Sequence, residues 1–190
     1  MVLLTVLTAL ALNTPLMAQA SIHDNRNELS VNYGYLSTTM AIPVLADIFA
    51  TVLSFGAAKP DNTRSTGAIG IEYFRYNQSG RFAYGAAASF ELVRTDMYDK
   101  DNKFVGEQRF SMATLMPACK LSWFNKEHVS MYTKLAAGIG FLPDSDGTPV
   151  CFAAQFNPVC LEAGNSRLRG FMELGWGMQG LVMGGIRYGF

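Results

Sequence analysis

The chain has 190 residues, 49% of them hydrophobic, and its 15 Lys and Arg residues equal its 15 Asp and Glu residues in number. This balance leaves no basic footprint for nucleic acid and no polybasic patch for a membrane surface, so we expect no nucleic-acid partner. After the first twenty residues no apolar run reaches the roughly 20 residues of a membrane-spanning helix, so insertion into a bilayer would have to use strands.

Residues 1–20 have the pattern of a secretory signal peptide. An apolar run leads through Asn13 and Pro15 to Ala18-Gln19-Ala20, a small-x-small cleavage pattern. The run is short for a membrane span and is interrupted by Asn13 and Pro15, so we expect cleavage rather than a retained inner-membrane anchor. Residues 21–190 would then form one exported domain.

Eight segments alternate apolar and polar residues with the period of two that predicts strands. Their expected ranges are 28–37, 65–78, 81–98, 107–124, 128–142, 151–163, 167–176 and 180–190. Most reach the ~9 to 11 residues with which a tilted strand crosses a bilayer. An even number of strands closes without an unpaired edge. The sequence therefore predicts an all-β, eight-stranded antiparallel up-and-down transmembrane β-barrel.

The connections between these segments must keep the two faces of each strand continuous. Segments 65–78 and 81–98 need an even connection, and Ser79-Gly80 would supply a two-residue turn. The two following short hairpins need odd connections, which residues 125–127 and 164–166 would supply. Pro117 removes a hydrogen-bond donor from its segment, so we expect a bulge or a strand boundary there.

The outward register collects aliphatic and aromatic side chains. Aromatic residues near strand ends are typical of the interfacial girdles of membrane barrels. The candidates are Tyr33, Tyr73, Phe82, Tyr84, Trp123, Trp176, Tyr188 and Phe190.

The inward register collects one polar residue from each of the eight segments. These residues are Asn32, Glu72, Glu91, Lys120, Lys134, Gln155, Glu173 and Arg187. A Lys or Arg facing lipid at mid-depth costs about 2 to 4 kcal/mol, whereas opposite charges in one lumen compensate one another. We therefore expect a structural plug of ion pairs, with a proton or ion path or a salt-bridge gate as the alternative.

The longest connection, residues 38–62, is predicted to be the first extracellular loop and to carry a short amphipathic helix. Its apolar face would lie in the outer leaflet or over the barrel mouth, with the groove of a partner as the alternative. That face includes Leu45, Ile48, Phe49, Val52 and Leu53.

Nothing in the sequence indicates an active site, a metal site or a cofactor. His23 lies beside the expected cleavage site and His128 beside a short turn, so neither suits an outward-facing base. The odd number of cysteines cannot pair fully, and Cys151 and Cys160 on one extended strand would lie roughly 30 Å apart. We expect no enzyme and no Cys151–Cys160 disulfide.

Several short motifs resemble those of small outer-membrane β-barrel proteins of Gram-negative bacteria. They include Arg81-Phe82-Ala83-Tyr84-Gly85 and the segments 28–35, 71–73, 172–177 and 186–190. The aromatic end, with Tyr188 and Phe190, is similar to the closing strand that the barrel assembly machinery recognises. The resemblance implies an eight-stranded barrel in contact with outer-membrane lipid and lipopolysaccharide, and it carries over no substrate.

These observations predict an integral outer-membrane barrel with a structural or surface-binding and adhesive role. Its first loop and outer rim would contact an extracellular partner. Two alternatives remain open, a narrow ion or small-solute channel and a soluble periplasmic lipocalin-like binder.

Overall fold

The computed structural model describes residues 26–38, 59–98, 104–143 and 149–190, and for 59–64, 95–98 and 104–108 it describes the course of the backbone alone. The expected signal peptide and the expected helix of the first loop, with Leu45, Ile48, Phe49, Val52 and Leu53, lie outside the described residues. Within the described part of the chain, no helix is long and apolar enough to span a bilayer.

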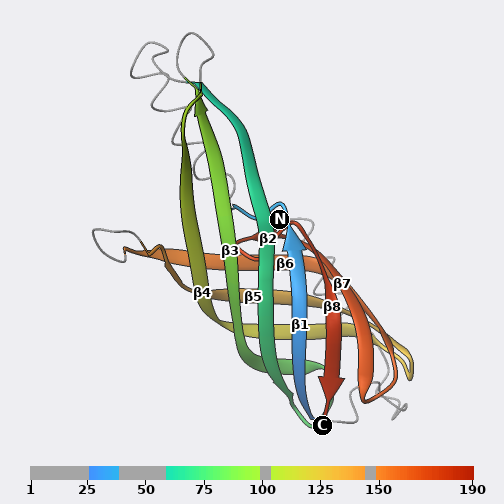
Figure 1. Ribbon diagram of the computed structural model, residues 1–190. Helices are drawn as coiled ribbons and strands as arrows, with labels where there is room; N and C mark the ends of the chain where they lie inside the picture. The colour runs from blue at the N-terminus through green and yellow to red at the C-terminus, as the bar shows by residue number, and fades with distance from the viewer. Residues whose placement is uncertain (1–25, 39–58, 99–103, 144–148) are drawn as a thin grey trace, which may run out of the picture.

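Eight strands close into one antiparallel barrel (Figure 1). They are β1 Asn27–Tyr35, β2 Lys59–Tyr76, β3 Phe82–Tyr98, β4 Phe104–Asn125, β5 Val129–Phe141, β6 Val150–Gly164, β7 Leu168–Gly177 and β8 Val182–Gly189. Each strand pairs with its neighbours in sequence, and β8 pairs with β1 to complete the cylinder. The predicted eight-stranded up-and-down barrel is confirmed, although β2 begins six residues before the predicted position 65.

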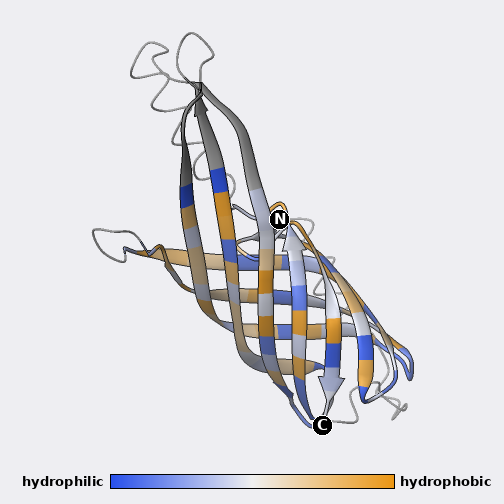
Figure 2. Cartoon of the chain, in the orientation of Figure 1, coloured by the Kyte–Doolittle hydropathy of each residue, from blue (hydrophilic) through white to orange (hydrophobic). Residues whose placement is uncertain are grey.

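Hydrophobic and hydrophilic residues alternate along the strands, as Figure 2 shows. On β3, Ala83 and Ala87 are buried inside the barrel, whereas Phe82 and Tyr84 are exposed on its outer face. Because side chains alternate across a strand, one residue in two faces the lumen. The facing predicted for this strand is confirmed.

The turn between β2 and β3 is wider than predicted. The amide of Asn77 donates to the carbonyl of Phe82 at 2.8 Å, so the four residues 78–81 lie between them, rather than Ser79-Gly80 alone. The number is still even, so the two strands keep the predicted facing.

The connections predicted at 125–127 and 164–166 do have three residues between the strands, at 126–128 and 165–167, but the hydrogen bonds that close both turns enclose only two residues. The amide of Lys126 donates to the carbonyl of Val129 at 2.9 Å, and that of Asn165 donates to Leu168 at 3.0 Å. The change of facing comes instead from bulges within the strands, where the register shifts between Ser122 and Phe124 and between Phe156 and Val159.

Pro117 does not mark a bulge or a boundary, contrary to the prediction. β4 continues through it, and Pro117 stands opposite Ala86 with no shift of register. The bulge lies at Pro158 of β6, where the register shifts against both neighbouring strands. A bulge tolerates proline because one residue there is left out of the ladder. The carbonyl of Pro158 accepts a hydrogen bond from the hydroxyl of Thr133 at 2.9 Å.

Three strands of the barrel sheet continue beyond the rim, where they form an open three-stranded part that we call the extension (Figure 1). It comprises residues 59–67, 92–98 and 104–112. β2 pairs with β1 only from Ala68 onward, and β4 pairs with β5 only from Ala113 onward. Beyond those points β2, β3 and β4 pair only with one another. A bulge between Ser65 and Ala68 lies at the base of the extension.

Candidate functional site

The eight polar residues expected in the lumen are all buried, with no more than 4% of any of them exposed. They come from eight different strands, so the described lumen is polar around its whole circumference. Six of the eight carry a charge. A buried charge is stable only when it is paired or hydrogen-bonded, so the partners of these groups decide what the lumen can do.

Five of these six charged residues join with three others to form what we call the ion-pair network. Its members are Glu28, Glu72, Lys120, Lys134, Glu162, Arg169, Glu173 and Arg187, and each of these side chains is fully buried or nearly so. The network holds four acidic and four basic side chains. Its formal net charge is therefore zero.

Arg187 of β8 connects the acidic members of the network. Its guanidinium pairs with Glu162 and with Glu173, the latter at 3.4 Å. Its Nε atom lies 3.3 Å from Glu28, without the geometry of a hydrogen bond. A weaker contact of 3.9 Å reaches Glu72, so one cation contacts acids from β1, β2, β6 and β7. The guanidinium also lies over the ring of Phe171, 4.1 Å from its centre.

The other three cations also form ion pairs with acids that Arg187 contacts. Lys134 bridges Glu72, at 2.7 Å, and Glu173. Arg169 pairs with Glu28 at 3.0 Å, and Lys120 pairs with the same carboxylate. The network therefore ties opposite walls of the barrel together through its interior.

Neutral polar side chains complete the hydrogen bonding of the acids. The hydroxyl of Tyr132 and the amide of Asn157 both donate to Glu173. Gln179, in the turn between β7 and β8, donates to Glu72 at 3.3 Å, and its backbone amide donates to Gln155 at 2.8 Å. Buried networks whose members are mostly satisfied hold one arrangement of side chains, so these contacts favour a closed and rigid interior.

Glu91 is the one predicted charge that lies outside the network. Its carboxylate accepts hydrogen bonds from the hydroxyls of Ser37 and Ser65. Both serines stand beside unusual backbone, because Leu36 has a φ of 57° and Gly67, in the bulge of β2, has a φ of 76°. Glu91 therefore belongs to the rim at the base of the extension.

The sequence reasoning missed three members of the network. Glu28 and Arg169 have the same alternation as Asn32 and Glu173, so the signal was present and was not used. Glu162 has the opposite alternation to Gln155, because the bulge at Pro158 reverses the facing of the rest of β6. Only the proline itself could have indicated that reversal.

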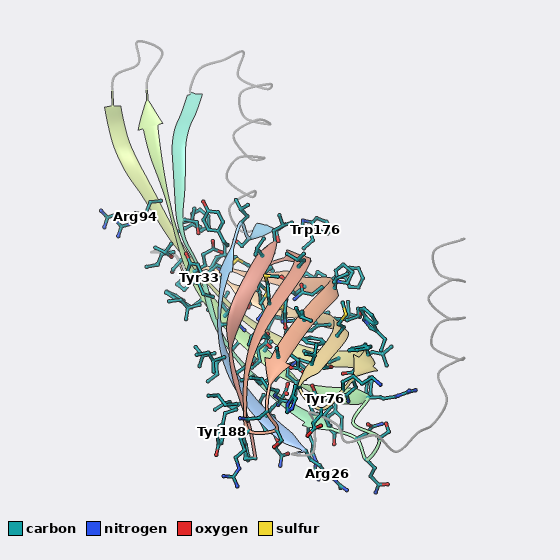
Figure 3. The ribbon with its side chains drawn as sticks, turned by 90° about the vertical axis from the view of Figure 1, so that its right-hand side faces the viewer. Arg26, Tyr33, Tyr76, Arg94, Trp176 and Tyr188 are labelled. Carbon is teal, nitrogen blue, oxygen red and sulfur yellow. The ribbon has the colours of Figure 1, made fainter. Side chains whose placement is uncertain are left out.

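The outer face is apolar, in contrast to the lumen. Large hydrophobic side chains are exposed on all eight strands, among them Ile71, Leu135, Phe152, Trp176 and Ile186. Trp176 is 69% exposed. In Figure 3, Tyr33 and Trp176 lie near the end from which the extension rises, and Tyr188 lies near the opposite end.

Metal binding and disulfide chemistry have no described site. Within the described residues, no group of three or more His, Cys, Asp or Glu side chains could hold a metal ion. The thiols of Cys119, Cys151 and Cys160 are all free.

Neither a scan against models of protein families nor a search of curated proteins finds a match to this chain. The function must therefore be argued from the barrel itself.

Proposed function

We propose that the protein is an integral β-barrel of the outer membrane of a Gram-negative bacterium. Its role is structural or surface-binding rather than catalytic, and its lumen is closed by ion pairs. One observation carries the proposal: the polarity of the barrel is inverted, with charges buried inside and apolar side chains exposed outside.

Water would not stabilise such an outer face. Burial of a large apolar side chain away from water is favourable by about 1.5 to 3 kcal/mol. Such side chains are exposed on every strand, and Phe152 of β6 and Ile186 of β8 are examples. Apolar patches larger than a few hundred Å² mark surfaces that contact protein or membrane. A soluble lipocalin-like binder would need the reverse arrangement, with an apolar lumen and a polar exterior. The inverted polarity therefore favours the bilayer.

The seam that closes the barrel, where β8 pairs with β1, supports the resemblance to outer-membrane barrels. The last residue, Phe190, exchanges two backbone hydrogen bonds with Asn27 of β1, at 2.9 and 3.1 Å. The rings of Tyr188 and Phe190 stack on the outer face, with their centres 6.3 Å apart. Both aromatic rings thus stand at the seam that closes the barrel, where the assembly machinery would bind them. Membrane lipid and lipopolysaccharide would surround the wall.

The contents of the lumen favour a plug over a channel. Eight strands enclose a space that side chains can fill, and here it holds the ion-pair network and an apolar cluster that includes Phe74 and Met116. The charged lumen is nevertheless the observation that would favour the second candidate, a narrow ion channel. Planar-bilayer recordings separate the two: a plug gives no steps, whereas a channel gives ohmic steps that Glu173→Gln alters.

Membrane insertion is tested by charges placed on the outer wall. Ile71 lies halfway along the barrel wall, opposite Val31, so Ile71→Lys should cost about 2 to 4 kcal/mol of folding free energy in vesicles. Leu168 is the first residue of β7, so Leu168→Lys lies near the interface and should cost at most about 1 kcal/mol. Equal costs for the two variants, or a wild-type chain that stays in the aqueous fraction on flotation, would contradict the proposal.

A further inference from the structure

Three arginines stand in one row across the extension. In the strand register Arg64 is opposite Arg94, and Arg94 is opposite Arg109. Neighbouring strands lie about 4.8 Å apart, and like charges directly opposite one another destabilise a sheet. Such a row concentrates positive charge at the base of the extension, and an anion bound there would offset part of the repulsion.

The position of this arginine row relative to the apolar wall is specific. Arg94 follows Phe90 and Leu92 on the outward face of β3, and both of these side chains are exposed. Arg94 and Arg109 are themselves exposed. In Figure 3, Arg94 points away from the barrel, beyond the level of Tyr33. The row thus begins where the apolar wall ends.

A row of acidic residues follows on the side away from the barrel. The register aligns Asp61 with Asp96, and Asp96 with Glu107. Along the extension the order is therefore apolar, basic and then acidic. A long polyanion such as nucleic acid would be repelled by the acidic row. A phosphate at the surface of an apolar layer would reach the arginine row before the acidic row.

We propose that the arginine row, through the exposed side chains of Arg94 and Arg109, binds the phosphate groups of anionic lipids in the leaflet that surrounds this rim. The proposal rests on the proposed membrane function. A guanidinium matches phosphate with two parallel hydrogen bonds. It also has five N–H donors, so it can hold a carboxylate of the sheet and a lipid phosphate at the same time.

The test measures which lipids lie beside the row. Trp123 and Trp176, the only tryptophans of the chain, are replaced by Phe, and Phe90→Trp places one reporter on the outward face of β3 below Arg94. The barrel is inserted into phosphatidylcholine vesicles that contain a small fraction of lipid with brominated chains, which quench tryptophan. The brominated lipid is either phosphatidylcholine or phosphatidic acid.

Phosphatidic acid should quench the reporter more strongly than phosphatidylcholine at the same mole fraction. A basic residue near a membrane surface contributes about a fivefold preference for anionic lipid, so Arg94→Gln/Arg109→Gln should lower the relative affinity by more than tenfold. The matched control Arg75→Gln/Arg167→Gln removes two exposed arginines from the other end of the barrel and should leave the preference unchanged. Inorganic phosphate at constant ionic strength should not compete with the lipid. Folding of each variant is checked by the mobility difference between heated and unheated samples.

The outcomes separate this proposal from the membrane function. If neither brominated lipid quenches the reporter, the protein does not span the bilayer and both proposals fail. If both lipids quench equally, the barrel spans the membrane but the arginine row does not bind lipid phosphate. If the control variant loses the preference as fully as Arg94→Gln/Arg109→Gln does, the preference reflects net charge alone and the row is not a site. Displacement by inorganic phosphate would overturn the assignment to lipid.

Discussion

Arg187→Met removes the cation that connects four acids of the described lumen, and it should be strongly destabilising. The network changes from four acids and four bases to four acids and three bases, all buried. Removing one partner of a buried ion pair costs about 3 to 5 kcal/mol. The guanidinium also loses its position over Phe171, which adds about 0.5 to 2 kcal/mol. We expect the free energy of unfolding to fall by roughly 4 to 6 kcal/mol.

A double-mutant cycle isolates the electrostatic part of that loss. Glu162→Gln alone leaves one base in excess, whereas Arg187→Met/Glu162→Gln restores three acids and three bases. The double variant should therefore lose less stability than Arg187→Met alone, because it no longer leaves an acid in excess in the lumen. Arg75→Met serves as the control, because Arg75 is exposed on the outer face and its replacement should stay within about 0.5 kcal/mol.

Urea unfolding in lipid vesicles measures these differences. Both tryptophans are exposed on the outer face, so their emission reports loss of the surrounding lipid. If Arg187→Met costs less than about 1 kcal/mol, or if the double variant equals the sum of the singles, then the reasoning about the network is wrong.

Three further substitutions test the backbone of the barrel in the same assay. Thr133→Val removes the donor to the carbonyl of Pro158 and should cost about 1 to 3 kcal/mol, whereas Thr133→Ser should retain most of the stability; equal losses would exclude this hydrogen bond as the cause. Gly34→Ala would place a methyl group against a carbonyl oxygen of the turn between β7 and β8, so it should destabilise the rim by more than about 1 kcal/mol, while Gly170→Ala, which meets open space, should be neutral within about 0.5 kcal/mol. Pro117→Ala should not lower stability, because the strand is continuous there, and a clear loss would indicate a role for this proline that the register does not show.

The number of strands and the facing of most side chains could be predicted because both follow from the alternation of residues. Tyr84 and Glu91 on β3, for example, differ by an odd number of positions and face opposite sides of the wall. A slip of one residue would exchange the two faces, so the pattern fixes the register wherever the strands are regular.

The alternation of residues does not predict where a bulge reverses the facing of a strand. The sequence gives no sign of the extra residue at Trp123, and its only sign of the one at Pro158 is the proline itself, since a bulge changes hydrogen bonding without a fixed composition. The parity argument therefore assigned the change of facing to the loops, and it overlooked Glu162. The extension was missed in part for a related reason. Residues 59–64 read Lys-Pro-Asp-Asn-Thr-Arg, and the part of the sheet that lies outside the barrel does not need the apolar face that gives alternation its signal.

The ion-pair network has a consequence for register as well as for stability. In a bilayer, a one-residue slip of β5 would turn Lys134 toward lipid, at about 2 to 4 kcal/mol, and it would also leave Glu72 and Glu173 without this partner. An apolar lumen would impose no such penalty, since both faces of each strand would then suit lipid. Buried ion pairs often add little net stability over apolar residues of similar volume. Our hypothesis is therefore that the network mainly specifies the register, and the cycle at Arg187 tests it. A nearly neutral Arg187→Met/Glu162→Gln variant beside two costly single variants would fit specification, whereas a double variant as costly as Arg187→Met alone would mean that this pair contributes net stability.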